Sequence, residues 1–141
     1  MSKALKTLER VKKFELDEQR RRLALKLDNL AKLQTALHHL NSDYEKEKEF
    51  VSRQPALYDF GAFTAQYLKK RRALEESIEK AEADISQLRD IMADVFKEQK
   101  TFEIIDNIQQ KAKQKMLDDA EQKMLDEIGT NAYIKHHSSS N

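Results

Sequence analysis

Apolar residues recur every three or four positions along two long stretches of this chain, one on each side of its only proline, Pro55. Spacings of three, four and seven place side chains on one stripe of a helix. A stripe sustained over several heptads is typical of a coiled-coil seam. The predicted seam residues are Leu16, Leu23, Leu30 and Leu37 in the first stretch and Leu74, Ile78, Ile85, Leu88, Met92 and Val95 in the second.

Each seam has one irregularity. In the first stretch Leu27, Leu33 and Leu40 are predicted to fill the same face, but an upstream stripe at Leu5, Leu8 and Val11 is out of phase with it. This offset predicts a stutter near Phe14. In the second stretch the seam continues through Gln99, and a polar seam residue often sets the register at some cost in stability.

Composition alone is compatible with two classes of chain, one that forms long helices and one that is disordered. Charged residues make up 36% of the 141 residues, apolar residues 39%, and there are only two glycines. Such a composition is typical of long helices, but also of chains that bury too little surface to fold. Because the apolar periodicity is sustained over about four heptads, we reject disorder for most of the chain.

The turn-forming residues define a hairpin. Pro55 cannot lie inside a helix, because it lacks the N–H group and clashes with the preceding turn. Gly61 is expected to close the turn. The sequence therefore predicts an all-α fold, a long two-helix antiparallel coiled-coil hairpin with a C-terminal helical overhang. The expected bounds are about 3–52 and 62–129 for the helices, 53–61 for the tip and 130–141 for a disordered tail after Gly129.

Charge supports this pairing. Residues 1–26 contain nine basic and four acidic residues, whereas residues 74–106 contain ten acidic and four basic ones. A turn centred near residue 57 would place residues 20–22 opposite residues 92–94. Flanking charges of opposite sign favour this pairing, although they add little stability.

The second helix is predicted to be the longer one, so residues 110–130 form an overhang without a partner in the same chain. The overhang carries a second apolar stripe, and such a stripe indicates an interface with another chain. Its residues are Met116, Leu117, Ala120, Met124, Leu125 and Ile128.

The sequence contains no recognisable catalytic or metal-binding motif. No glycine-rich phosphate loop is present, and there is no cysteine. His38 and His39 are neighbours on a helix and point about 100° apart, so they cannot share a metal ion. We therefore expect a protein that is not an enzyme, with no catalytic, cofactor or metal residues. The sequence contains no signal peptide or membrane span, which favours the cytoplasm.

The basic runs and the aromatic residues near the tip can each be explained either by the fold or by binding to a partner. The basic runs at 20–22 and 69–72 are either helix flanks or sites for nucleic acid or anionic lipid, and we favour the former. Aromatic residues crowd around the tip, where they form either a small core or a docking surface through Tyr58 and Phe60.

Four segments resemble one known family. They are "LERVKKFELDEQRRRLA" (8–24), "FTAQYLKKRRALEESIEKAEADI" (63–85), "FKEQKTFEI" (96–104) and "DEIG" (126–129). In order and spacing they are similar to the flagellar export protein family FliJ, most closely to its alphaproteobacterial branch. The likeness covers nearly the whole chain, except the tail.

The resemblance implies a cytoplasmic component of the flagellar type III export apparatus, at the cytoplasmic face of the basal body. Its partners would be the hexameric export ATPase, the membrane export-gate protein and export chaperones, with no nucleic acid and no direct membrane contact. The paired ends would bind the ATPase ring through Lys6, Arg10, Lys13, Met116, Leu117, Met124 and Ile128, whereas Tyr58 and Phe60 at the tip would face elsewhere, where the gate is one possible contact.

Other functions remain open from the residues alone. The same architecture fits the stalk of a virulence type III secretion system. A generic coiled-coil scaffold could homodimerise through residues 104–128. The basic runs would suit a nucleic-acid or membrane-surface binder, whose binding would weaken steeply with salt.

Overall fold

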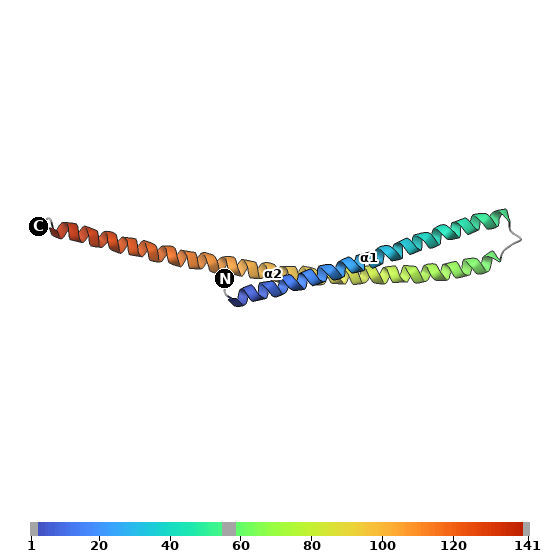
Figure 1. The fold of residues 1–141 in the computed structure, drawn as a ribbon, viewed down its shortest axis with the longest axis horizontal. Coiled ribbons are helices and arrows are strands. Elements are labelled where there is room, and N and C mark those ends of the chain that lie inside the picture. Colours follow the sequence, from blue (N-terminus) through green and yellow to red (C-terminus); the bar gives the residue numbers. More distant parts are fainter. Residues whose placement is uncertain (1–2, 55–58, 140–141) are drawn as a thin grey trace. The chain divides into compact units, whose positions relative to one another are not determined.

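The computed structural model of the chain describes residues 3–54 and 59–139. These residues form two α-helices, α1 (Lys3–Arg53) and α2 (Phe60–Ser139), and include no strand. The two long helices pack against each other (Figure 1), which confirms the predicted all-α helical hairpin.

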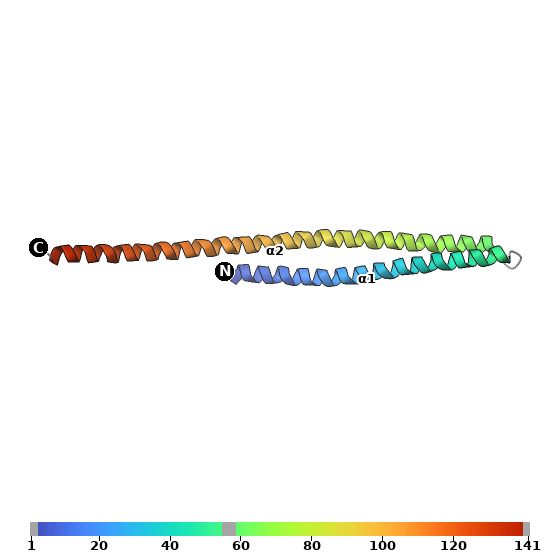
Figure 2. The same cartoon turned by 90° about the horizontal axis from the view of Figure 1, so that it is seen from above.

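The chain divides into two compact units. The hairpin unit is residues 14–96, and the terminal unit combines residues 1–13 with residues 97–141. Within the hairpin unit, α1 and α2 lie side by side and run in opposite directions in both views (Figures 1 and 2). Within the terminal unit, Lys12 Nζ of α1 lies 2.5 Å from Glu98 Oε2 of α2.

The core of the hairpin unit is one thin seam. Among the seam residues named from the sequence, Leu16, Ile85, Leu88 and Val95 are buried, and Leu23, Leu30, Leu37, Leu74, Ile78 and Met92 are half-buried. No described side chain is completely shielded from solvent. Two helices cover each other on one face only, so burial is spread along the seam instead of being concentrated in a centre.

Leu27 does not lie in the seam, contrary to expectation. It is 39% exposed, whereas the preceding residue, Lys26, is half-buried. Successive seam positions are alternately three and four residues apart. Position 26 is three residues after Leu23 and four residues before Leu30, so Lys26 and not Leu27 occupies the seam. The methylene stem of a lysine can cover apolar surface while its ammonium group stays in water.

The start of α2 differs from the prediction. Asp59 caps the helix: its Oδ1 accepts a hydrogen bond from the Ala62 N–H at 3.2 Å, as an N-cap side chain does. Gly61 therefore lies in the first turn of α2 and has no positive φ, so it does not close the turn. Pro55 and Tyr58 lie outside the described residues.

The end of α2 also differs. The helix continues through Gly129 to Ser139, beyond the end expected at residue 129. Gly129 has no positive φ, unlike a glycine that ends a helix in the left-handed conformation. Glycine inside a helix costs only about 1 kcal/mol relative to alanine, which long helical neighbours on both sides can offset.

Two contacts near the tip define the register of the hairpin unit. Tyr44 Oη lies 3.1 Å from Thr64 Oγ1, and the Tyr67 hydroxyl donates a hydrogen bond to Asn41 Oδ1 at 2.6 Å. In both pairs the two residue numbers average 54, so the helices pair about residue 54 and not about residue 57, the expected centre of the turn. Because the cap at Asp59 lets α2 begin early, residues 20–22 face a part of α2 that lies more than one helical turn closer to the tip than residues 92–94.

Candidate interaction surfaces

Aromatic side chains form a stack between the helices near the tip. The Tyr44 ring of α1 lies at its centre, with centroid distances of 3.9 Å to Tyr67, 5.7 Å to Phe60 and 6.1 Å to Phe63. Phe60 is half-buried in this stack. Because the stack also carries the hydrogen bonds of Tyr44 and Tyr67, it joins the two helices at this level.

The sequence indicated the α2 side of this stack but not its centre. Phe60, Phe63 and Tyr67 follow spacings of three and four, which place them on one helix face. Tyr44 follows Leu37 by seven residues and so continues the apolar repeat of α1, which does not by itself indicate aromatic partners. The signal that could have located the stack is the aromatic character of this single position in an otherwise leucine-rich seam.

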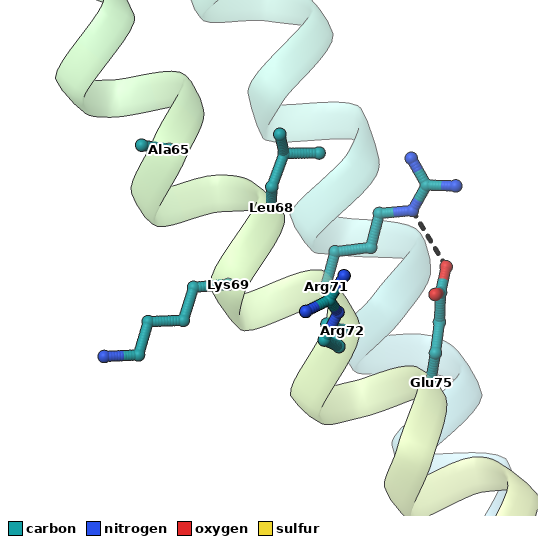
Figure 3. Close-up of a pocket in the computed structure, with 6 residues that line it drawn as sticks. All are labelled: Ala65, Leu68, Lys69, Arg71, Arg72 and Glu75. Atoms are coloured by element: carbon teal, nitrogen blue, oxygen red, sulfur yellow. Dashed lines mark hydrogen bonds and ion pairs between the residues drawn. The ribbon is translucent and has the colours of Figure 1, made fainter.

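The basic run at 69–72 lies on an open surface of α2. Side chains of this one helix line a shallow depression, and Lys69 and Arg71 leave the helix in different directions (Figure 3). Arg71 Nε donates a hydrogen bond to Glu75 Oε1 at 2.8 Å, which, together with the charge of Glu75, raises the pKa of Arg71 above its ordinary value. No second element walls the depression, so it lacks the enclosure of a ligand pocket.

The basic run at 20–22 makes ion pairs along its own helix. Arg20 Nη1 lies 3.2 Å from Asp17 Oδ1, and Arg21 Nη1 lies 3.3 Å from Glu18 Oε1. These are pairs with a spacing of three residues within α1, where the sequence led us to expect partners on the opposite helix. Exposed pairs of this kind contribute between zero and about 1 kcal/mol.

A second basic surface lies on α1 in the terminal unit. Lys6, Arg10 and Lys13 are all exposed. Their spacings of four and three place them on one face of the helix, which we call the basic stripe. The structure therefore brings these three predicted residues together on one surface.

The part of α2 beyond the start of α1 is exposed on all sides. The Lys12–Glu98 pair places the first residue of α1 level with about residue 107, and every residue described from 107 to 138 is exposed. We call residues 107–139 the C-terminal arm. Its predicted contact residues Met116, Leu117, Met124 and Ile128 are 56–72% exposed. Single exposed apolar residues are ordinary, but this group within residues 116–128 makes the C-terminal arm a candidate interaction surface.

Neither helix, over its described residues, has a stretch long and apolar enough to cross a membrane. A family model described as "Flagellar FliJ protein" matches residues 1–138 of the chain. The chain belongs to the FliJ family. No match was found among curated proteins or among solved structures.

Membership of the FliJ family confirms the resemblance that the sequence segments indicated. FliJ proteins are non-catalytic components of flagellar type III protein export, so this chain is a component of that system. The match extends through both helices and most of the C-terminal arm. It therefore includes residues 133–138, in which the sequence displayed no family pattern.

Proposed function

We propose that this FliJ chain acts as a central-stalk-like coiled coil, whose terminal unit binds the ring of the flagellar export ATPase. The observation that carries the proposal is the difference in helix length. Helix α2 has 80 residues and α1 has 51, and the extra length of α2 exposes an apolar surface beside the basic N-terminal part of α1.

The two surfaces of the terminal unit have complementary roles in this proposal. Met116, Leu117, Met124 and Ile128 supply apolar area, which provides most of the binding energy when it is removed from water. The basic stripe supplies positive charge, which steers association with acidic groups of a partner and raises the association rate. Both surfaces belong to the same compact unit.

The proposed mechanism is conformational. A stalk without an active site can change the activity of an ATPase ring only if it contacts one conformation of the subunits more favourably than another. The hairpin unit would then connect the ring to the membrane export gate, with the tip as one possible contact, and export chaperones are further possible partners. In this proposal the chain works at the cytoplasmic face of the basal body.

The test is the ATP turnover of the cognate export ATPase with and without the full chain, at enzyme concentrations where the ring is only partly assembled. We expect turnover to rise when the chain is added. The double variant Met116→Ala/Met124→Ala should lose most of this rise, because it removes exposed apolar side chains from the C-terminal arm.

The matched control is Gln114→Ala/Gln122→Ala. It also places two alanines eight residues apart in the same arm, but at polar positions, and should retain the rise. If the wild-type chain has no effect at any enzyme concentration, the stalk proposal is wrong. If the methionine variant stimulates as well as the wild type, the contact lies outside these residues of the arm.

A further inference from the structure

The composition of the seam changes along α1. Its seam positions follow one another at steps of four and three, and every one of them from Leu5 to Tyr44 is buried or half-buried. The five positions from Leu30 to Tyr44 hold four leucines and one tyrosine. The seven positions before them lie in residues 3–26, which we call the strap, and four of these seven are polar. The seam positions of the strap are Leu5, Glu9, Lys12, Leu16, Gln19, Leu23 and Lys26.

Gln19 is the least favourable of these polar residues in the seam. It is 8% exposed, and its buried Oε1 accepts no hydrogen bond from the residues that the structure describes. Because the helices pair about residue 54, Gln19 lies about level with residue 89, next to the buried Leu88. A carbonyl oxygen that leaves water without gaining a partner disfavours the closed seam at this point.

The two lysines in the seam of the strap bury less apolar surface than leucines would. Lys12 and Lys26 are half-buried. A lysine covers the seam with its methylene stem while its ammonium group stays in water. The Lys12–Glu98 ion pair joins the strap to α2, but the Glu98 side chain is 51% exposed, and exposed pairs contribute little stability.

Other apolar residues of the strap do not compensate for this loss. Leu8 and Val11 are 45% and 53% exposed, so they lie outside the seam. Among the described residues, the strap has two buried apolar side chains, Leu5 and Leu16. Segments with few buried apolar contacts open locally at a lower free energy than the rest of a protein.

The part of α1 near the tip is held by stronger contacts. Tyr44 and Tyr67 stack across the hairpin with a centroid distance of 3.9 Å, and each hydroxyl makes a hydrogen bond with the opposite helix. The strap lies at the free end of α1. It can therefore separate from α2 without breaking the contacts of Tyr44 and Tyr67.

We propose that the strap is a releasable segment, which separates from α2 while the part of the hairpin near the tip stays paired. Separation gives water access to Gln19 Oε1 and uncovers Ile85 and Leu88 of α2, which are 4% and 7% exposed in the closed state. A helix without tertiary contacts is marginal in water, so the released strap loses the protection of its amides. The strap carries the basic stripe, so a partner that binds this stripe better in one state than in the other would shift the balance between them.

Hydrogen exchange of the full chain, measured amide by amide, tests the proposal. We expect the amides of residues 16–26 to be at least about tenfold less protected than those of residues 37–44. Gln19→Leu should slow exchange in the strap by about tenfold, because it replaces a buried unpaired oxygen by an apolar group. The control Gln87→Leu makes the same change at an exposed position beside Leu88, and should alter these rates by less than about twofold.

A variant near the tip distinguishes release of the strap from unfolding of the whole hairpin. Tyr67→Phe removes the hydroxyl that donates a hydrogen bond to Asn41. The amides of residues 37–44 should then exchange about fivefold faster, since one hydrogen bond is lost. The amides of residues 16–26 should keep their wild-type rates, because the contacts near the tip persist when the strap is released.

Equal protection of residues 16–26 and 37–44 overturns the proposal, because the hairpin would then open as one unit. Exchange in the strap that accelerates in Tyr67→Phe as much as exchange near the tip overturns it as well. An unchanged rate in Gln19→Leu overturns the role of Gln19 in release. None of these measurements uses the ATPase, so the strap and the stalk proposal can fail separately.

Discussion

At the scale of single residues, two polar contacts define how α1 and α2 pair near the tip. An apolar seam with a seven-residue repeat can slide by one heptad and still bury leucine against leucine. The hydrogen bonds from Tyr67 to Asn41 and between Tyr44 and Thr64 exist in one register only. We infer that these side chains contribute more to the choice of register than to the total stability.

Replacing Tyr67 by phenylalanine tests the stronger of these contacts. Tyr67→Phe keeps the ring in the stack but removes the hydroxyl that lies 2.6 Å from Asn41 Oδ1. We expect the free energy of unfolding to fall by about 1 kcal/mol, the usual net contribution of one hydrogen bond. Urea denaturation followed by circular dichroism measures this change.

Tyr133→Phe serves as the control for that variant. Tyr133 lies on the C-terminal arm and is 63% exposed, so the same chemical change should alter the unfolding free energy by less than about 0.5 kcal/mol. If the two variants are equally stable, the Tyr67 hydroxyl does not hold the hairpin.

At the scale of the element, α2 is one helix of 80 residues that starts at a capped end and passes through both glycines. A backbone at Gly129 without a positive φ is helical, and nothing lies within 4 Å of the position that a Cβ would occupy. The glycine therefore weakens the helix at this point through its backbone entropy alone.

Gly129→Ala should consequently strengthen α2. We expect the local opening free energy around residue 129 to rise by about 1 kcal/mol, since an added methyl group meets no atom and alanine has the higher helix propensity. Hydrogen exchange of the amides between residues 125 and 135 would slow by about fivefold. Faster exchange, or a loss of helical circular dichroism, would mean that Gly129 ends the helix after all.

At the scale of the whole molecule, charge is distributed unequally between the units. The basic stripe of the terminal unit and Arg20 and Arg21 of the hairpin unit are all exposed, but Arg20 and Arg21 also pair with acids of their own helix. The charges of Arg20 and Arg21 are therefore partly balanced by neighbouring acids, through ion pairs within α1. We expect the terminal unit to be the part of the chain that responds to acidic partners.

Reversal of two charges in the basic stripe tests this expectation. Arg10→Glu/Lys13→Glu should weaken binding to the export ATPase by about tenfold or more, with most of the effect on the association rate, because long-range attraction becomes repulsion. The difference from wild type should shrink as salt is added. Surface-immobilised ATPase with the full chain in solution gives both rate constants.

The matched variant is Arg20→Glu/Arg21→Glu, which changes the net charge by the same amount in the hairpin unit. Its binding should stay within about threefold of wild type, because these residues are not part of the proposed contact. Equal losses in both variants would indicate that net charge, and not the basic stripe, governs the association.

The fold class, the two helices and the apolar residues of the C-terminal arm could all be predicted from the sequence. Helical periodicity is a local property, so the seam positions of Leu16 and Ile85 follow from spacing alone. The order of four short segments was likewise enough to indicate the FliJ family. These features do not depend on which residues meet across the hairpin.

The register, the presence of Lys26 instead of Leu27 in the seam and the half-buried position of Phe60 could not be predicted and were found in the structure. Each depends on contacts between residues far apart in sequence, and a seven-residue repeat is compatible with several such pairings. The two glycines belong here as well. Glycine is compatible with both a turn and a helix, so the helical backbone around Gly61 and Gly129 had to be observed.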